Sequence, residues 1–213
     1  MTILTELSSQ IGEKTEAGNR KVAQACIQNE ELIEDIGEGL LSNDAALLGD
    51  CAEVCTMVAE QEPEKIVPYA DRLMNLLDHK KTRVRWESMH AIALITTFIP
   101  EKITIIIPTL KEKIKSDKST IVRDYAIETL CNYASVGPAE AKLTYPILKD
   151  TLYLWEGKHR ARVLKGLLIV CQSTSEYTLE ILGTAQEMVD NPKGVVKKAA
   201  KNLIKAIERG EVK

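Results

Sequence analysis

A repeat of about 37 residues restricts how this chain can fold more than any other feature of the sequence. Pro63-Glu64-Lys65-Ile66 recurs as Pro100-Glu101-Lys102-Ile103, and a weaker copy begins at Pro138. Proline at the first position of a helix loses no hydrogen bond and presets φ, so each of these prolines predicts a helix start. A second marker is a basic residue, usually preceded by Val. It recurs at Val84-Arg85, Val122-Arg123, Arg160 and Val196-Lys197, and successive basic residues are 38, 37 and 37 positions apart. Two markers with one period indicate an array of stacked units.

Each unit is predicted to be a pair of helices. Between Ile103 and Ile114 the apolar residues follow the three-and-four spacing of a buried helical stripe. Ser116 to Thr120 then supplies turn and capping residues, and a second apolar stripe runs from Val122 to Ala134. No stretch alternates with period two for long enough to suggest a strand, so the predicted class is all-α.

We therefore expect one domain, residues 1–213, made of stacked antiparallel helix hairpins. Residues 1–28 are predicted to form a helical cap with Ile3, Leu4, Leu7 and Ile11 on one stripe. The predicted hairpins are 29–61, 62–98, 99–135, 136–172 and 173–210.

These hairpins resemble the HEAT repeat, an armadillo-type α-solenoid unit. The HEAT pattern has a proline within the first helix, an Asp at the turn and a basic residue near the start of the second helix. Pro68, Pro108 and Pro146 match the first feature. The resemblance implies a right-handed α-α superhelix in which the remaining matches form a structural ladder between repeats, namely Asp78, Arg85, Asp117, Arg123, Arg160 and Lys197.

The cysteines and the apolar segments favour a cytoplasmic protein. Five cysteines, an odd number, lie among apolar or small neighbours in helical stretches and are predicted to be buried thiols. Cys51 and Cys55 share a helix face, but no second pair or nearby His completes a metal site, so no metal or cofactor is expected. The longest run without charge, 88–100, is too short to span a bilayer, and the N-terminus lacks the pattern of a signal peptide.

The sequence contains no recognisable catalytic motif. The three histidines, His79, His90 and His159, belong to different hairpins or their turns, and neither H-E-x-x-H nor G-x-S-x-G occurs. The predicted function is a non-enzymatic scaffold for protein–protein interaction.

Charge is distributed unevenly along the chain. Residues 1–78 carry 16 acidic and 5 basic side chains, whereas residues 79–213 carry 15 acidic and 23 basic ones. Stacking would align the basic turns along one edge, and such a ridge could bind an acidic protein or a phosphate backbone. The candidate binding residues of this ridge and the adjoining groove are Lys80, Lys81, Arg83, Trp86, His90, Lys118, Lys158, His159, Arg162, Lys165, Lys193 and Lys198.

Two alternatives remain open. HEAT-like alkylpurine DNA glycosylases use a basic concave surface with tryptophans and an Asp, and Trp86, Trp155 and Asp124 would be the counterparts here. Nucleic acid is therefore the alternative partner, although no catalytic constellation matches residue by residue. The second alternative, a phycobiliprotein lyase-like role, rests on fold analogy alone. The opposite charges of the two halves also predict head-to-tail self-association at low salt.

Overall fold

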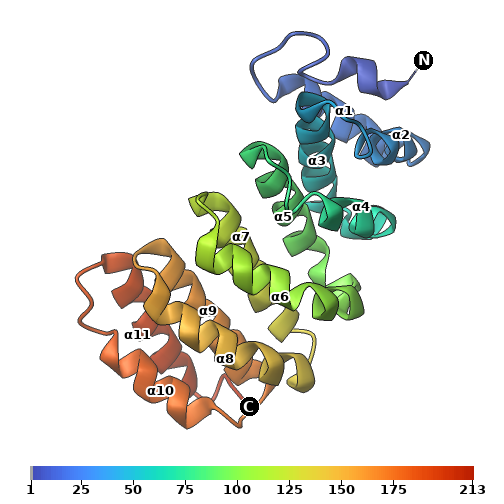
Figure 1. The fold of residues 1–213 in the computed structure, drawn as a ribbon. Coiled ribbons are helices and arrows are strands. Elements are labelled where there is room, and N and C mark those ends of the chain that lie inside the picture. Colours follow the sequence, from blue (N-terminus) through green and yellow to red (C-terminus); the bar gives the residue numbers. More distant parts are fainter. Residues whose placement is uncertain (1) are drawn as a thin grey trace. The chain divides into compact units, whose positions relative to one another are not determined.

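The computed structural model describes residues 2–213, so Met1 of the predicted cap lies outside the description. Within this range the regular structure consists of α-helices and short 3-10 helices, without a β-strand. The chain divides into two compact units, Met1–Ile99 and Pro100–Lys213 (Figure 1). No helix of the described residues is long and apolar enough to cross a membrane.

The first unit is a cap followed by two helical hairpins. Its elements are η1 (Ile3–Glu6), α1 (Ala17–Gln28), α2 (Glu31–Gly39), α3 (Ala45–Ala59), η2 (Pro63–Tyr69), α4 (Ala70–Asn75), α5 (Thr82–Ile95) and η3 (Thr96–Phe98). Helix α3 packs against α1 on one side and α5 on the other. The second helices of successive hairpins thus form one layer, which α2, η2 and α4 cover.

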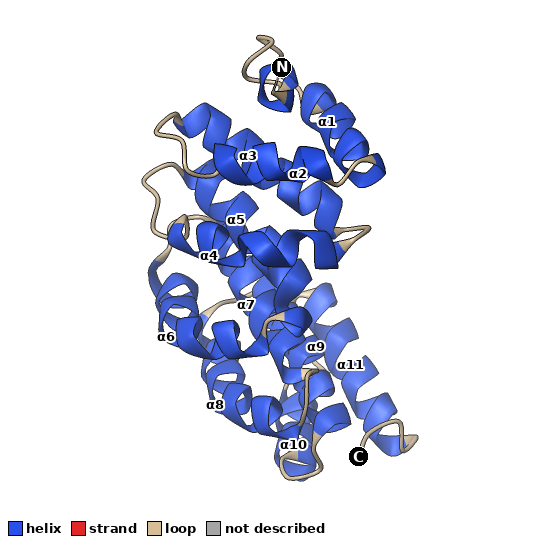
Figure 2. Cartoon of the chain, turned by 90° about the vertical axis from the view of Figure 1, so that its right-hand side faces the viewer, coloured by secondary structure: helices blue, strands red, loops and turns tan. Residues whose placement is uncertain are grey.

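The second unit consists of three further helical hairpins. Its elements are α6 (Pro100–Ser116), α7 (Thr120–Ala134), α8 (Pro138–Leu154), α9 (Lys158–Ser173), α10 (Thr178–Glu187) and α11 (Gly194–Glu208). Helix α9 packs between α7 and α11, while α8 contacts α6, α7 and α9. Figure 2 shows α6, α8 and α10 on one side of this unit and α7, α9 and α11 on the other.

The proline-marked helix starts are confirmed: η2 begins at Pro63, α6 at Pro100 and α8 at Pro138. The second hairpin differs because its first helix opens as a 3-10 helix and continues as the short α4. Pro68 follows Pro63 by five residues, whereas Pro108 follows Pro100 by eight. Only the longer spacing leaves two uninterrupted turns before the second missing N–H, so α6 stays α-helical.

The core is aliphatic, and all five cysteines are buried free thiols, as predicted. Gly166 of α9 brings that helix against α7, since a β-carbon at this position would collide with Cys131 Sγ. The predicted cap stripe is wrong in one respect. Only Ile3–Glu6 is helical before α1, and Ile11 is 50% exposed in the connecting turn.

Candidate protein-binding surfaces

The predicted ladder arginines bond to backbone carbonyls within their own hairpins. Arg85 Nη1 lies 2.8 Å from the His79 oxygen, and Arg160 Nε lies 2.9 Å from the Leu152 oxygen. Carbonyls at the end of a helix have no intrahelical partner, so these guanidinium groups satisfy acceptors at the turn between paired helices. Asp117 is buried, and its Oδ1 accepts the Ser119 N–H at 2.8 Å. The ladder role of Asp78 and Lys197 stays a prediction.

Arg123 joins two neighbouring turns. Its Nη1 donates to the Asp117 carbonyl at 2.7 Å, and its guanidinium carbon lies 4.0 Å from the centre of the Trp155 ring. The indole of Trp155 in turn donates to the Ile114 carbonyl in the last turn of α6, at 2.7 Å. Arg123 Nε also lies 3.4 Å from Nε2 of His159. Trp155 is thereby held between the ends of α6 and α8.

Arg83 binds two carboxylates of the preceding hairpin. Its Nη2 lies 2.7 Å from Asp50 Oδ1 and 2.9 Å from Glu53 Oε2, both on α3. Asp50 is almost fully buried; burial alone would raise its pKa, but hydrogen bonds from Ser9, Asn19 and Arg83 hold the pKa below its ordinary value. Arg83 therefore connects α5 to α3, and its charge is largely neutralised.

Arg162 of α9 repeats this arrangement in the second unit. It lies 2.9 Å from Asp124 and 2.5 Å from Glu128, both on α7. His159 Nδ1 lies 3.4 Å from Asp124 Oδ1, and Lys158 Nζ lies 3.9 Å from Oδ2. Burial would raise the pKa of Asp124, but the contacts with His159 and Arg162 lower it. His159 is only 3% exposed, so the prediction that it belongs to a surface ridge is wrong, because Arg123, Asp124 and Trp155 surround its ring.

The sequence interpretation missed a further set of contacts, which join successive hairpins to each other and the second hairpin to the cap. Lys65, the basic residue of the proline marker, donates to the Ile27 carbonyl at the end of α1, at 2.9 Å. Arg72 pairs with Glu38 at 2.9 Å, and Lys142 pairs with Glu176 at 2.5 Å. Both pairs join residues 34 apart. Opposite charges separated by about one repeat length in the sequence could therefore have predicted these ion pairs.

Trp86 and His90 are both half-buried on α5. The Trp86 indole donates a hydrogen bond to Oε1 of its neighbour Glu87. Glu87 is 8% exposed, and burial raises its pKa from 4.5 to about 7, with the Glu53 charge adding to the rise and the Trp86 bond and Arg83 charge opposing it. The Trp86 indole is thus occupied within the protein.

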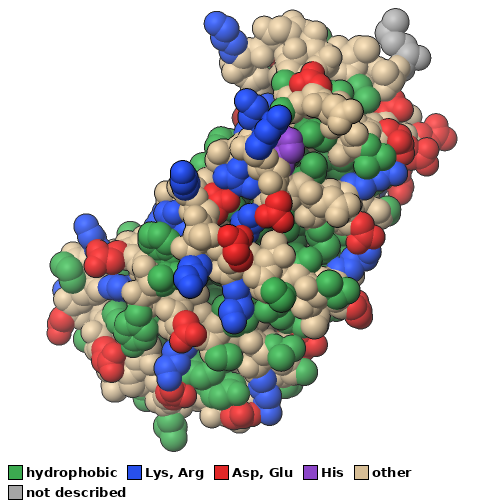
Figure 3. Space-filling model, in the orientation of Figure 1, with side chains coloured by type: hydrophobic (Ala, Val, Ile, Leu, Met, Phe, Trp, Pro, Cys, Tyr) green, Lys and Arg blue, Asp and Glu red, His purple; other side chains and the backbone are tan. Residues whose placement is uncertain are grey.

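Among the residues of the predicted ridge, the exposed lysines are dispersed, except at α11. Lys80 and Lys81 are exposed at the turn before α5, Lys118 before α7, and Lys165 on α9. Helix α11 carries the half-buried Lys197 and the exposed Lys201 and Lys205 at i, i+4 and i+8, which share one face. Lys193 precedes this helix, Lys198 flanks the face, and none of these five lysines has an acidic partner within the described residues. On the face drawn in Figure 3, blue and red side chains are otherwise intermixed.

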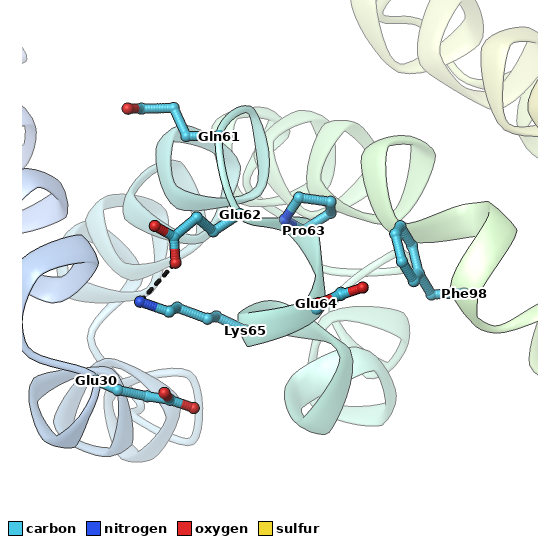
Figure 4. A pocket seen from close by; sticks show the side chains of 7 residues that line it. All are labelled: Glu30, Gln61, Glu62, Pro63, Glu64, Lys65 and Phe98. Carbon is cyan, nitrogen blue, oxygen red and sulfur yellow. Dashed lines mark ion pairs between the residues drawn. The ribbon is translucent and has the colours of Figure 1, made fainter.

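An acidic recess of about 560 Å³ lies on the first unit, where α3 leads into η2. Glu62, Pro63, Glu64 and Lys65 line it from the turn, with Phe98 and Glu30 at its other sides. Figure 4 shows Lys65 extending between Glu62 and Glu30, and its Nζ lies 2.5 Å from Glu62 Oε2. The charge of Lys65 therefore already balances part of the negative charge of this recess.

The described residues 2–213 contain no group of three or more His, Cys, Asp or Glu side chains arranged to hold a metal ion.

The fold agrees closely with solved repeat proteins. An engineered protein aligns with a TM-score of 0.74 at 17% identity, covering 99% of this chain and all of that one. A designed armadillo repeat protein, solved in complex with the peptide (KR)4, aligns at 0.71 and 17% identity over 96% of this chain and 97% of its own. The chain has the armadillo/HEAT-type α-solenoid fold.

A natural protein shares this architecture. Kap121p, in its complex with Ste12p, aligns at a TM-score of 0.71 and 15% identity, and 95% of this chain spans 24% of Kap121p. No family model matches the sequence, and no curated protein does either. At such identities the likeness concerns the fold, and one fold hosts many functions.

Proposed function

We propose that this solenoid is a non-catalytic interaction scaffold, which binds an acidic segment of a partner protein through the basic face of α11. The face consists of Lys193, Lys197, Lys198, Lys201 and Lys205. The observation that carries the proposal is that these lysines have no acidic partner within the described residues, whereas Arg83 and Arg162 are each bound to two carboxylates.

The surroundings of this face favour a protein over a nucleic acid. On the neighbouring helix α9, Arg162 is bound to Asp124 and Glu128, so it does not extend a phosphate-binding surface beyond α11. Of the two tryptophans that could stack on a base, Trp155 has Arg123 over its ring, and Trp86 is half-buried and belongs to the first unit. Asp124 is similarly engaged by Arg162, which removes the support for a glycosylase-like site.

The structural relatives support the scaffold but do not define the partner. One designed armadillo protein was solved with (KR)4, a basic peptide, and Kap121p was solved with Ste12p. A repeat surface of this kind suits extended protein segments. The acidic character of the partner proposed here follows from the lysines of α11, because a basic segment would be repelled there.

The proposal is tested by titrating the protein with a fluorescein-labelled peptide rich in Glu and Asp, and by mapping the contact from amide chemical shifts. We expect saturable binding that weakens with salt, with the largest shifts between residues 193 and 205. Lys197→Glu combined with Lys201→Glu should abolish it. Lys14→Glu combined with Lys21→Glu makes the same change in net charge on exposed lysines of the first unit and should leave it intact.

Three outcomes contradict the proposal. Shifts spread over all exposed lysines would mean non-specific attraction. Tighter binding of a duplex DNA of equal length, with the same shifts, would assign the face to nucleic acid. Light scattering that shows the chain binding itself through α11, as the charge asymmetry predicts at low salt, would make a second copy the partner.

A further inference from the structure

An apolar groove lies between the first helices of two consecutive hairpins in the second unit, away from the lysines of α11. Helices α6 and α8 contact each other and enclose a groove of about 240 Å³ near their C-terminal ends. Ile114, Ile147, Thr151 and Leu154 line it. Leu154 is 45% exposed, so an apolar side chain at the groove meets water.

The apolar surface continues along α8 beyond the groove. Leu143, Ile147 and Leu154 are at i, i+4 and i+11 on one line of the helix, with the exposed Asp150 at i+7 between Ile147 and Leu154. Leu143 is 50% exposed and Ile147 is half-buried. Single exposed apolar side chains are common on protein surfaces, but exposed apolar side chains that gather beside a groove favour contact with another protein.

The walls of the groove are fixed in place. The Trp155 indole bonds to the Ile114 carbonyl at 2.7 Å, with Arg123 stacked on its ring. Arg160 Nε bonds to the Leu152 carbonyl at 2.9 Å, close to the end of α8. Two of the predicted ladder arginines thus hold the helix ends that form the groove. A groove already formed before binding loses little conformational entropy when it is occupied.

The size of the groove points to a protein side chain. Sites for small molecules generally have volumes of roughly 300–1,000 Å³. This groove is smaller, at about 240 Å³, and suits one or two aliphatic side chains that anchor a larger contact.

The rim determines the charge of the occupant. Lys111 and Lys115 line the groove, are four apart in the last turns of α6, are exposed, and have no acidic partner within the described residues. Asp150 is the one acidic side chain among the lining residues. We propose that the groove binds an amphipathic helix of a partner protein, whose apolar side chains lie on Leu143, Ile147 and Leu154 and whose acidic side chains pair with Lys111 and Lys115.

The test uses two labelled helical peptides and fluorescence anisotropy with the full chain. Both carry leucines at i, i+4 and i+11; one has Glu beside them and the other Lys. The Glu peptide should bind and the Lys peptide should not. Lys111→Glu combined with Lys115→Glu should reverse this preference, which a merely structural role of these exposed lysines would not produce.

The apolar contribution is tested by Leu143→Asp combined with Leu154→Asp, which should weaken binding of the Glu peptide by at least about tenfold. Leu179→Asp is the matched control, because Leu179 is 85% exposed on α10 and does not line the groove. Far-UV circular dichroism verifies that each variant is folded. The lysine substitutions on α11 should leave this binding unchanged, so failure here is distinguishable from failure of the proposed function.

The inference is overturned if neither peptide binds, if both bind equally, or if Leu179→Asp weakens binding as much as the double substitution does. It is also overturned if the groove mutations abolish self-association of the chain seen by light scattering, since a second copy would then be the occupant.

Discussion

Replacing the buried Glu87 with glutamine should stabilise the protein at alkaline pH and leave it nearly unchanged at acidic pH. Glu87 lies on α5 facing Glu53 of α3, Arg83 of its own helix and Glu16 before α1, and its pKa is raised from 4.5 to about 7, mainly by burial. Because the folded pKa is above the unfolded one, the folded state binds this proton more tightly. The stability from this group is complete below the unfolded pKa and is lost as pH rises through about 7.

The magnitude follows from the two pKa values. A difference of one pKa unit corresponds to about 1.4 kcal/mol. The rise from 4.5 to about 7 therefore means that ionised Glu87 lowers the free energy of unfolding by about 3 kcal/mol in total. Roughly 2 kcal/mol of this is lost between about pH 5.5 and about pH 8. The glutamine side chain in Glu87→Gln cannot ionise, and its oxygen can still accept the Trp86 indole proton.

The measurement is urea denaturation of the wild type and of Glu87→Gln at about pH 5.5 and about pH 8, with circular dichroism as the readout. All other ionisable groups are common to both proteins, so the difference between the two stability changes isolates Glu87. The wild type should lose roughly 2 kcal/mol more than the variant between the two pH values. Equal losses in the two proteins would refute the reasoning.

Three further substitutions test the packing and the ion pairs. Gly166→Ala should lower the free energy of unfolding by about 1–3 kcal/mol, measured by urea denaturation, because the new methyl group would meet Cys131; an unchanged midpoint would show that the helices separate freely. Arg162→Ala should lower the free energy of unfolding by about 2 kcal/mol near neutral pH, because the buried Asp124 loses its closest cation. This loss should shrink as acid protonates Asp124, and a loss independent of pH would contradict the pairing. Lys65→Met should lower the melting temperature by a few degrees, because the hydrogen bond from Lys65 to the end of α1 is lost, and amide hydrogen exchange should increase first at that end. A uniform increase in exchange would contradict a local stabilising role of Lys65.

The sequence determined the helical class and much of the helix positioning. Proline fixes its own φ and lacks an N–H, so a proline that starts a helix is a local signal that needs no tertiary information. That is why Pro63, Pro100 and Pro138 marked the starts of η2, α6 and α8. Apolar periodicity similarly identified the buried stripes and the buried cysteines.

Only the tertiary structure decided which charges remain available for a partner. Arg83, Arg162 and Lys198 were all predicted to belong to the basic ridge, yet the two arginines bind carboxylates one hairpin away, while Lys198 on α11 has no such partner within the described residues. The α6–α8 groove also joins Ile114 and Leu154, which are 40 residues apart. A local pattern specifies the face of a helix on which a residue lies, but pairing and exposure depend on what the neighbouring helix places opposite it.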